Sequence, residues 1–239
     1  MPSAAERTRT LVQSTSSAVL LVPGVNSARP EQLMPLARSV GPDGEIFLVL
    51  PADSPVVRAA THAQDDELTA VLEITDVAPV AVPHRIRGRA WITGWLTCVP
   101  GIAEPGRMML RLEVGDASVD DLWGAEGVEP EEFARAEADP LVAHEAELLQ
   151  HLYSAHGEQV RTLGRLLGGR AGQAAPGPCE RVVPLALDRF GLRVRLTHAH
   201  GDCRPAEHTF DARFEFPEPV RDITGLRRAM HGLFEAAAG

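Results

Sequence analysis

One stretch of fifteen residues, 85–99 (RIRGRAWITGWLTCV), constrains the fold most because it alternates over its whole length. A period of two is typical of a β-strand with two different faces. One face is mostly apolar and carries Ile86, Gly88, Ala90, Ile92, Gly94, Leu96 and Cys98. Two glycines on such a face predict the close approach of another strand, as in a sharply bent or closing sheet.

The opposite face of this predicted strand combines guanidinium groups with indoles. It carries Arg85, Arg87, Arg89, Trp91, Thr93, Trp95 and Thr97. Arginine binds a carboxylate or phosphate through two parallel hydrogen bonds, and tryptophan offers a flat apolar wall. The face is therefore a candidate site for an anionic, planar ligand. In the alternative interpretation, the arginines pair with acids across a dimer interface.

Short apolar runs bounded by turn residues predict the other strands of a first domain, residues 1–138. They lie at 18–22, 32–37, 45–50, 68–74, 108–114 and 119–123. Two short helices are expected at 5–13 and 54–63. The acidic segment 126–139 predicts a connector with a short helix, and we place the domain boundary near Ala138. Many strands with few helices are typical of a β-barrel.

Residues 139–167 change to a helical period and open the second domain, residues 139–239. Apolar side chains and one histidine recur at three- and four-residue steps: Leu141, Leu148, Leu149, Leu152, His156, Val160, Leu163 and Leu167. Asp139 is a predicted N-cap with Pro140 at the first helical position, and Gly168 marks the end. The pattern predicts one long amphipathic helix.

Two histidines lie in the middle of that predicted helix. On a continuous helix, His151 and His156 would point about 140° apart, which argues against a shared site. His156 falls on the apolar stripe, and we interpret it as structural. His151 shares an edge with His144, Glu147 and Glu158, where it could contact a ligand. The alternative for His151 is a hydrogen-bonded residue at a domain contact.

For the rest of the second domain, the sequence predicts three strands and a last helix. The strands are expected at 181–187, 191–197 and 211–216, and the helix begins at Asp222 or Thr224. The complete chain is thus predicted to be α+β. The segment between the last two strands contains His198, His200, Cys203 and His208. It lacks the spacing of a zinc motif, so we interpret it as a hairpin loop and predict no metal site, with metal binding as the alternative.

Three segments together resemble the C-terminal domain of the haem-utilisation (HugZ-type) proteins. They are EAELLQHLYSAHGEQV, VPLALDRFGLRVRL and DARFEFPEPVRDITGLRRAMHGLF. The opening helix of that domain usually bears a His-Met-Asn-x-Asp-His core, in which the two histidines match His151 and His156. The element order before residue 138, together with RIRGRAWITGW, resembles the flavin-binding split β-barrel of the pyridoxamine-phosphate-oxidase type. In this family, that barrel precedes the C-terminal domain.

The resemblance implies a haem- or flavin-associated protein that forms a two-fold homodimer, with haem or FMN at the subunit junction. The residues expected to bind the cofactor are Arg85, Arg87, Arg89, Trp91, Trp95 and His151. In haem-degrading relatives, the axial histidine lies in a C-terminal extension that has no counterpart after Phe234. Two alternatives remain: a non-catalytic regulatory protein of tetrapyrrole metabolism that docks through the acidic segment 116–147, and an FMN-dependent oxidoreductase.

Composition excludes several other classes of function. With 33 acidic and 23 basic residues among 239, the net charge is -10, which disfavours binding to nucleic acid. The three cysteines are widely spaced and imply no disulfide framework, as expected in the cytoplasm. No run approaches the ~20 apolar residues that a membrane span needs. No GxSxG, GxGxxG or Walker motif is present, so the sequence names no catalytic residue.

Overall fold

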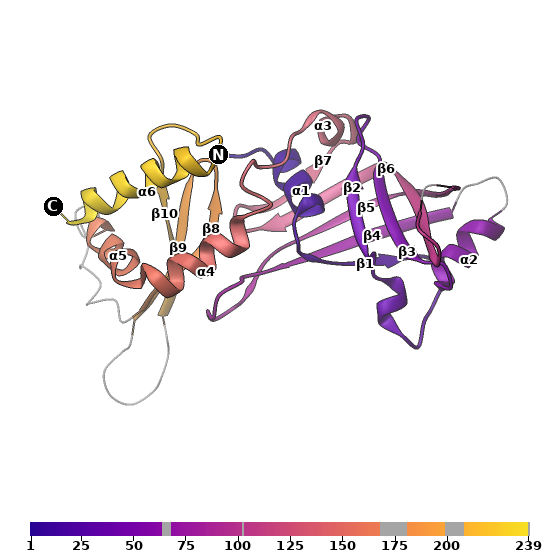
Figure 1. Ribbon diagram of the computed structural model, residues 1–239, viewed down its shortest axis with the longest axis horizontal. Helices are drawn as coiled ribbons and strands as arrows, with labels where there is room; N and C mark the ends of the chain where they lie inside the picture. Colours follow the sequence, from indigo (N-terminus) through magenta and orange to yellow (C-terminus); the bar gives the residue numbers. More distant parts are fainter. Residues whose placement is uncertain (64–67, 102, 168–180, 199–207, 239) are drawn as a thin grey trace. The chain divides into compact units, whose positions relative to one another are not determined.

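The computed structural model describes residues 1–63, 68–101, 103–167, 181–198 and 208–238 (Figure 1). The chain divides into two compact units. Residues 2–77 and 86–138 form the first, which we call the sheet unit. Residues 1, 78–85 and 139–239 form the second, the C-terminal unit. None of the helices in these described ranges is long and apolar enough to cross a membrane.

An antiparallel sheet dominates the sheet unit. Within the described residues it has seven strands: β1 (Ser17–Leu21), β2 (Ala37–Val40), β3 (Ile46–Pro51), β4 (Leu68–Val77), β5 (Ile86–Val99), β6 (Arg107–Asp121) and β7 (Gly124–Val128). The strand order is β1-β4-β5-β6-β3-β2, and β7 pairs with β6. The sheet curls into a half-barrel of the split-barrel type. The chain is therefore α+β, as the sequence predicts.

The concave side of this sheet holds a single apolar core. Leu20, Leu48, Leu72, Ile92 and Leu112, one from each of five strands, have no exposed surface. They occupy alternate positions of their strands, so the period of two in the sequence places them correctly.

Short helices cover the ends of the sheet unit. They are α1 (Ala4–Gln13), the 3₁₀ helix η1 (Pro30–Leu33), α2 (Pro55–His62) and α3 (Pro130–Arg135). Ser3 and Glu6 form a capping box at α1, and the Ser54 hydroxyl accepts a hydrogen bond from Val56 N at α2. Phe133 of α3 is completely buried in the core of the unit.

The structure of the sheet unit differs from the prediction in three places. Residues 30–33 form η1 where a strand was expected from 32 to 37, because Pro30 favours the first turn of a helix. The two strands predicted at 108–114 and 119–123 are one strand, β6, which continues through a bulge at Gly115. Strand β7 was not predicted, because only Val128 among its five residues is buried and the segment therefore lacks an alternating apolar pattern.

The backbones of β5 and β6 approach each other closely at Gly94. A Cβ atom at this position would lie 1.9 Å from the carbonyl oxygen of Glu113. No side chain fits in that space, so the glycine is required by the neighbouring backbone. This confirms the close strand approach that the two glycines predicted.

In the C-terminal unit, helices pack on one three-stranded sheet. The elements are α4 (Glu145–Ala155), α5 (Gly157–Thr162), η3 (Leu163–Leu167), β8 (Arg181–Asp188), β9 (Gly191–His198), β10 (His208–Glu215) and α6 (Ile223–Ala238). The strand order is β10-β9-β8. Helices α4 and α5 contact β8, and α6 contacts α5 and η3 (Figure 1). The predicted α-β-β-β-α arrangement is confirmed.

The prediction of a single long helix over residues 139–167 is wrong. The Asp139 carboxylate caps a separate turn by accepting from Leu141 N at 2.9 Å, and α4 begins only at Glu145. Helix α4 ends at Ala155. The next residue, His156, has a φ of -122° and a ψ of 20°, which are not helical, and α5 starts at Gly157. Glycine has a low helix propensity, which favours an interruption here.

Residues 78–85, the loop between β4 and β5, belong to the C-terminal unit. Arg195 of β9 holds this segment: its Nη1 donates to the carbonyls of Pro83 at 2.6 Å and His84 at 2.8 Å. The same guanidinium binds the Asp211 carboxylate through two further hydrogen bonds. This polar network could not be predicted from the sequence, because its residues are far apart along the chain.

Part of the predicted hairpin loop with candidate metal ligands falls outside the described residues. Strand β9 ends at His198 and β10 begins at His208, and these two residues pair in register. His200 and Cys203 lie between them, in the range 199–207 that the structure does not describe.

Replacing Gly94 with alanine tests the close approach. The new methyl group must displace the Glu113 backbone, and such overpacking costs about 1–3 kcal/mol or more. Gly127→Ala is the matched control, because a Cβ at Gly127 meets nothing within 4 Å. We expect urea unfolding to show a large loss of stability for Gly94→Ala and a change within about 0.5 kcal/mol for Gly127→Ala. Equal effects would contradict the proposed geometry.

Asp139 gives a pH-dependent prediction. Burial raises the pKa of this carboxyl above its ordinary value, although hydrogen bonds from Arg189 N and Leu141 N oppose the shift. A raised pKa means that the folded state binds the proton more tightly, so this group's stabilisation is lost as pH rises from about 4. We therefore expect the wild type to lose stability relative to Asp139→Asn between about pH 4 and neutrality, so that the unfolding free energy of the wild type minus that of the variant falls. If this free-energy difference did not change with pH, the pKa of the Asp139 carboxyl would not be raised by burial.

Candidate functional site

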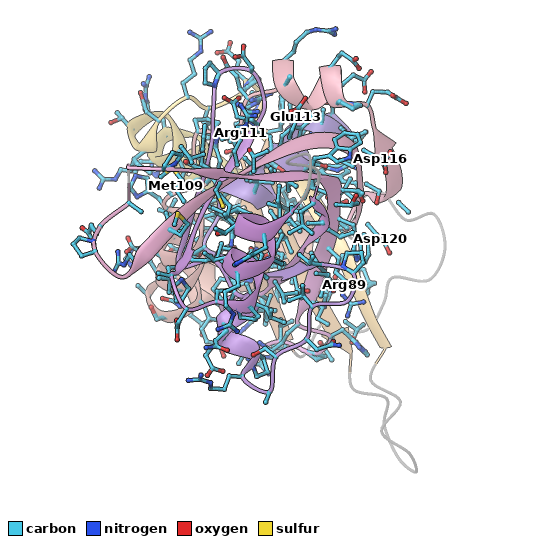
Figure 2. The ribbon with its side chains drawn as sticks, turned by 90° about the vertical axis from the view of Figure 1, so that its right-hand side faces the viewer. Arg89, Met109, Arg111, Glu113, Asp116 and Asp120 are labelled. Atoms are coloured by element: carbon cyan, nitrogen blue, oxygen red, sulfur yellow. The ribbon has the colours of Figure 1, made fainter. Side chains whose placement is uncertain are left out.

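The convex side of the sheet unit carries the candidate site. We call it the outer face and define it by the outward residues of three strands. These are Thr69, Val71, Glu73 and Thr75 of β4; Arg89, Trp91, Thr93, Trp95 and Thr97 of β5; and Arg111, Glu113, Asp116, Ser118 and Asp120 of β6. Figure 2 shows Arg89, Asp120 and Asp116 along one side of this unit, with Glu113 and Arg111 further along β6.

Two indoles form the apolar part of the outer face. Trp95 is 44% exposed, and Trp91 is half-buried between Glu73 and Ser118 of the neighbouring strands. A Cβ atom at Gly115 would lie 2.7 Å from Cζ3 of Trp95, so the indole lies directly over the bulge in β6. The missing side chain at Gly115 leaves room for the ring. The pair offers a flat, apolar wall.

Arg89 lies at one end of the two indoles. It is exposed, and it pairs in register with Asp120 on β6 and Thr75 on β4. Within the described part of the chain, its guanidinium makes no ion pair. It therefore has hydrogen-bond donors available for an anionic group.

Arg87 does not share this face, contrary to the alternation in the sequence. A bulge opposite Asp76 shifts the register of β5, so Arg87 turns inward and is only 8% exposed. Its Nε and Nη2 atoms each lie 2.9 Å from an oxygen of the Asp76 carboxylate. The Ser16 hydroxyl donates to the same carboxylate. Arg87 is thus part of a buried ion pair inside the sheet unit.

Arg85 and His151 belong to the other unit. Arg85 closes the base of the 78–85 segment: its Nη2 donates to Ala78 O at 2.9 Å, and its carbonyl accepts from Ala78 N. His151 lies in α4. Of the six residues predicted to bind a cofactor, the structure therefore brings Arg89, Trp91 and Trp95 together on one face.

The charge of the outer face differs from the prediction of a basic surface. Two guanidinium groups, Arg89 and Arg111, are outnumbered by the carboxylates of Glu73, Glu113, Asp116 and Asp120. The acids come from β4 and β6, so the alternation within β5 could not reveal them. The sequence EVGDASVDD of β6 carried the signal, but only the strand register shows which of its acids face outward.

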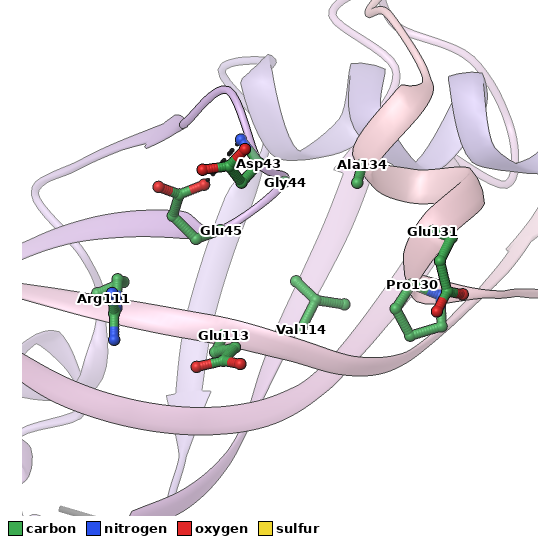
Figure 3. A pocket seen from close by; sticks show the side chains of 9 residues that line it. All are labelled: Asp43, Gly44, Glu45, Arg111, Glu113, Val114, Pro130, Glu131 and Ala134. Carbon is green, nitrogen blue, oxygen red and sulfur yellow. Dashed lines mark hydrogen bonds between the residues drawn. The ribbon is translucent and has the colours of Figure 1, made fainter.

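An acidic cleft of about 370 Å³ adjoins the outer face at Arg111 and Glu113 of β6 (Figure 3). Its wall comes from the 43–45 turn, from β6 and from α3: Asp43, Gly44, Glu45, Arg111, Glu113, Val114, Pro130, Glu131 and Ala134. Four carboxylates against one guanidinium repel anionic groups. The cleft is therefore unsuited to a phosphate or a propionate.

The two histidines of the C-terminal unit meet, which corrects the predicted separation. The helix break at His156 brings its Nε2 to 3.2 Å from Nε2 of His151, with the rings edge to face at 4.9 Å. His156 Nδ1 lies 2.5 Å from the amide oxygen of Gln159, and the ring stacks on Phe234. The estimate of 140° failed because it assumed a continuous helix. In the described residues, no cluster of three or more His, Cys, Asp or Glu could hold a metal ion.

Comparison with known proteins gives a structural relationship. No protein-family model and no curated protein matches the chain. Its structure is similar to a heme binding protein from Mycobacterium smegmatis, with a TM-score of 0.61 and 22% identity over 100% of this chain and 98% of that chain. This similarity shows a shared fold.

Two other solved structures are less similar. One is a protein of unknown function from Agrobacterium tumefaciens, with a TM-score of 0.41 and 15% identity over 98% of this chain and 97% of that chain. The other is a FAD and heme binding protein from Mycobacterium smegmatis, with a TM-score of 0.35 and 16% identity over 55% of this chain and 78% of that chain. At these TM-scores, neither supports an argument about the fold.

Single alanine substitutions separate the two arginines of β5. Arg87→Ala leaves the Asp76 carboxylate without its ion-pair partner, and breaking a buried pair costs about 3–5 kcal/mol. Arg89→Ala is the matched control on the same strand, with an expected change within about 0.5 kcal/mol. Thermal or urea unfolding measures both. If Arg89→Ala were the more destabilising change, our assignment of the two faces would be wrong.

Proposed function

We propose that this protein binds haem on the outer face of the sheet unit, with Trp91, Trp95 and Arg89 as the main contacts. The observation that carries the proposal is the pair of outward indoles beside an arginine that forms no ion pair within the described residues. The shared fold with a heme binding protein over the full chain supports it.

The chemistry of haem fits this arrangement. Its macrocycle is flat and apolar, and it removes indole surface from water by stacking on Trp95 and Trp91. Its two propionates carry negative charge and need a cationic partner. Arg89 lies beyond Trp91, opposite Asp120. Arg111 lies at the other end of the indoles, but it lines the cleft that contains four carboxylates, Glu113 among them. We therefore propose that the propionates point toward Arg89 and away from Glu113.

The face supports binding better than catalysis. None of its residues is a histidine, cysteine, methionine or tyrosine, the side chains that ligate haem iron. We therefore propose a haem-binding role without an axial ligand from this face. A non-catalytic regulatory protein of tetrapyrrole metabolism is the second candidate, because the excess of acids suits a basic protein partner. An FMN-dependent oxidoreductase is less well supported, since Arg89 and Arg111 lie at opposite ends of the two indoles and cannot bind one phosphate together.

We also propose that the protein is a homodimer that uses part of the same face. An exposed indole and charges of both signs suit a two-fold contact in which each arginine meets an acid of the other copy. Sedimentation of the wild type should give twice the mass of one chain. A monomer at all concentrations tested would contradict this part of the proposal.

Haemin titration tests the binding site. We expect the wild type to develop a shifted Soret band, and Trp95→Ala to weaken binding about tenfold or more, because a central aromatic anchor commonly contributes over 1.4 kcal/mol. Trp95→Phe is the control that keeps a flat ring, and its affinity should stay closer to that of the wild type. A flavin spectrum after FMN addition with no response to haemin would favour the oxidoreductase alternative. Equal haemin affinity of all three proteins would place the site elsewhere.

A further inference from the structure

The paired histidines of the C-terminal unit form a second candidate site, and it does not depend on the outer face. On a continuous helix, residues five positions apart point in different directions. The break between α4 and α5 removes this restriction and places Nε2 of His151 at 3.2 Å from Nε2 of His156. Two imidazole nitrogens therefore converge at a surface position.

This separation matches the geometry of two imidazoles on one metal ion. Zinc–imidazole bonds measure about 2.0–2.1 Å. With bonds of that length, nitrogen atoms 3.2 Å apart subtend about 100° at the metal, close to the tetrahedral angle. His151 is exposed, so its ring can rotate enough to direct the nitrogen lone pair at a bound ion.

The surroundings of His156 orient it as a ligand. The Gln159 amide oxygen is an acceptor, so the Nδ1 atom at 2.5 Å from it carries the proton. In a neutral ring, Nε2 then holds the lone pair, which accepts a hydrogen bond from His151 Nε2–H at 3.2 Å. When a metal ion takes the place of that proton, His151 carries its own proton on Nδ1 and both Nε2 atoms face the ion. Metal-binding histidines usually donate their other N–H to such an acceptor, which fixes the ring orientation. Stacking on Phe234 of α6 restricts the ring further.

We infer that His151 and His156 together bind a divalent transition metal ion of the imidazole-preferring class, such as Zn²⁺ or Cu²⁺. Nitrogen ligands disfavour Ca²⁺ and Mg²⁺, which prefer oxygen. Only two protein ligands are placed here within the described residues. The remaining positions are open to water or to an external ligand, so the bound ion is exchangeable.

Zinc titration of the complete chain, prepared without a histidine tag, tests this site. In isothermal calorimetry we expect the wild type to bind one equivalent of Zn²⁺. His151→Gln should weaken this binding about tenfold or more, because even the loss of a residue that only supports a metal ligand costs about that much. His151 is exposed, so this change should leave the fold intact, as circular dichroism can verify.

Two controls make the result specific. His231→Gln removes an exposed histidine of α6 that pairs with Glu235 and should leave zinc affinity unchanged. The double variant His200→Gln with Cys203→Ser removes the candidate ligands of the 199–207 segment and should also keep one equivalent. The inference is overturned if the wild type binds no zinc, if His151→Gln binds as tightly as the wild type, or if the double variant abolishes binding.

Discussion

The close contact between the β5 and β6 backbones at Gly94 is the constraint on which the sheet unit depends. A Cβ atom at this position would lie only 1.9 Å from Glu113 O, so the backbones of β5 and β6 can come this close only if residue 94 is a glycine. The bulge that follows in β6 adds Gly115 to one strand and increases the local twist. The same bulge makes room for the Trp95 indole, so the feature that bends the sheet also shapes its outer face.

The regular parts of this fold could be predicted from sequence because they follow simple periods. Ala90, Ile92 and Leu96 are buried as the alternation of β5 requires. The orientation of Arg87 could not be predicted from the sequence. One extra residue at the bulge turns its side chain to the opposite face of the sheet, and no sequence pattern indicates the bulge. The break at His156 is similar: the apolar stripe continues past it, and only the non-helical backbone of this residue reveals the interruption.

The structure differs from the prediction more in the candidate site than in the fold, because the surface of a sheet combines side chains from several strands. The sequence of β5 alone suggested three arginines beside two indoles. The register of β4 and β6 adds Glu73, Asp116 and Asp120 to the same face, while the Asp76 carboxylate binds Arg87 inside the unit. An apolar wall remains, with Arg89 at one end, Arg111 at the other and four carboxylates around them. This arrangement suits the edge and plane of a large ring better than a compact anion such as phosphate.

The central claim, that a planar tetrapyrrole stacks on the outer face, is tested most directly by NMR of the indole N–H groups. The chain has three tryptophans, so the ¹⁵N-labelled side chains give three resolvable signals that Trp→Phe variants can assign. A diamagnetic gallium protoporphyrin has a strong ring current and avoids paramagnetic broadening. We predict large shifts for Trp91 and Trp95 when it binds. A bound porphyrin that leaves both signals unmoved would contradict the account.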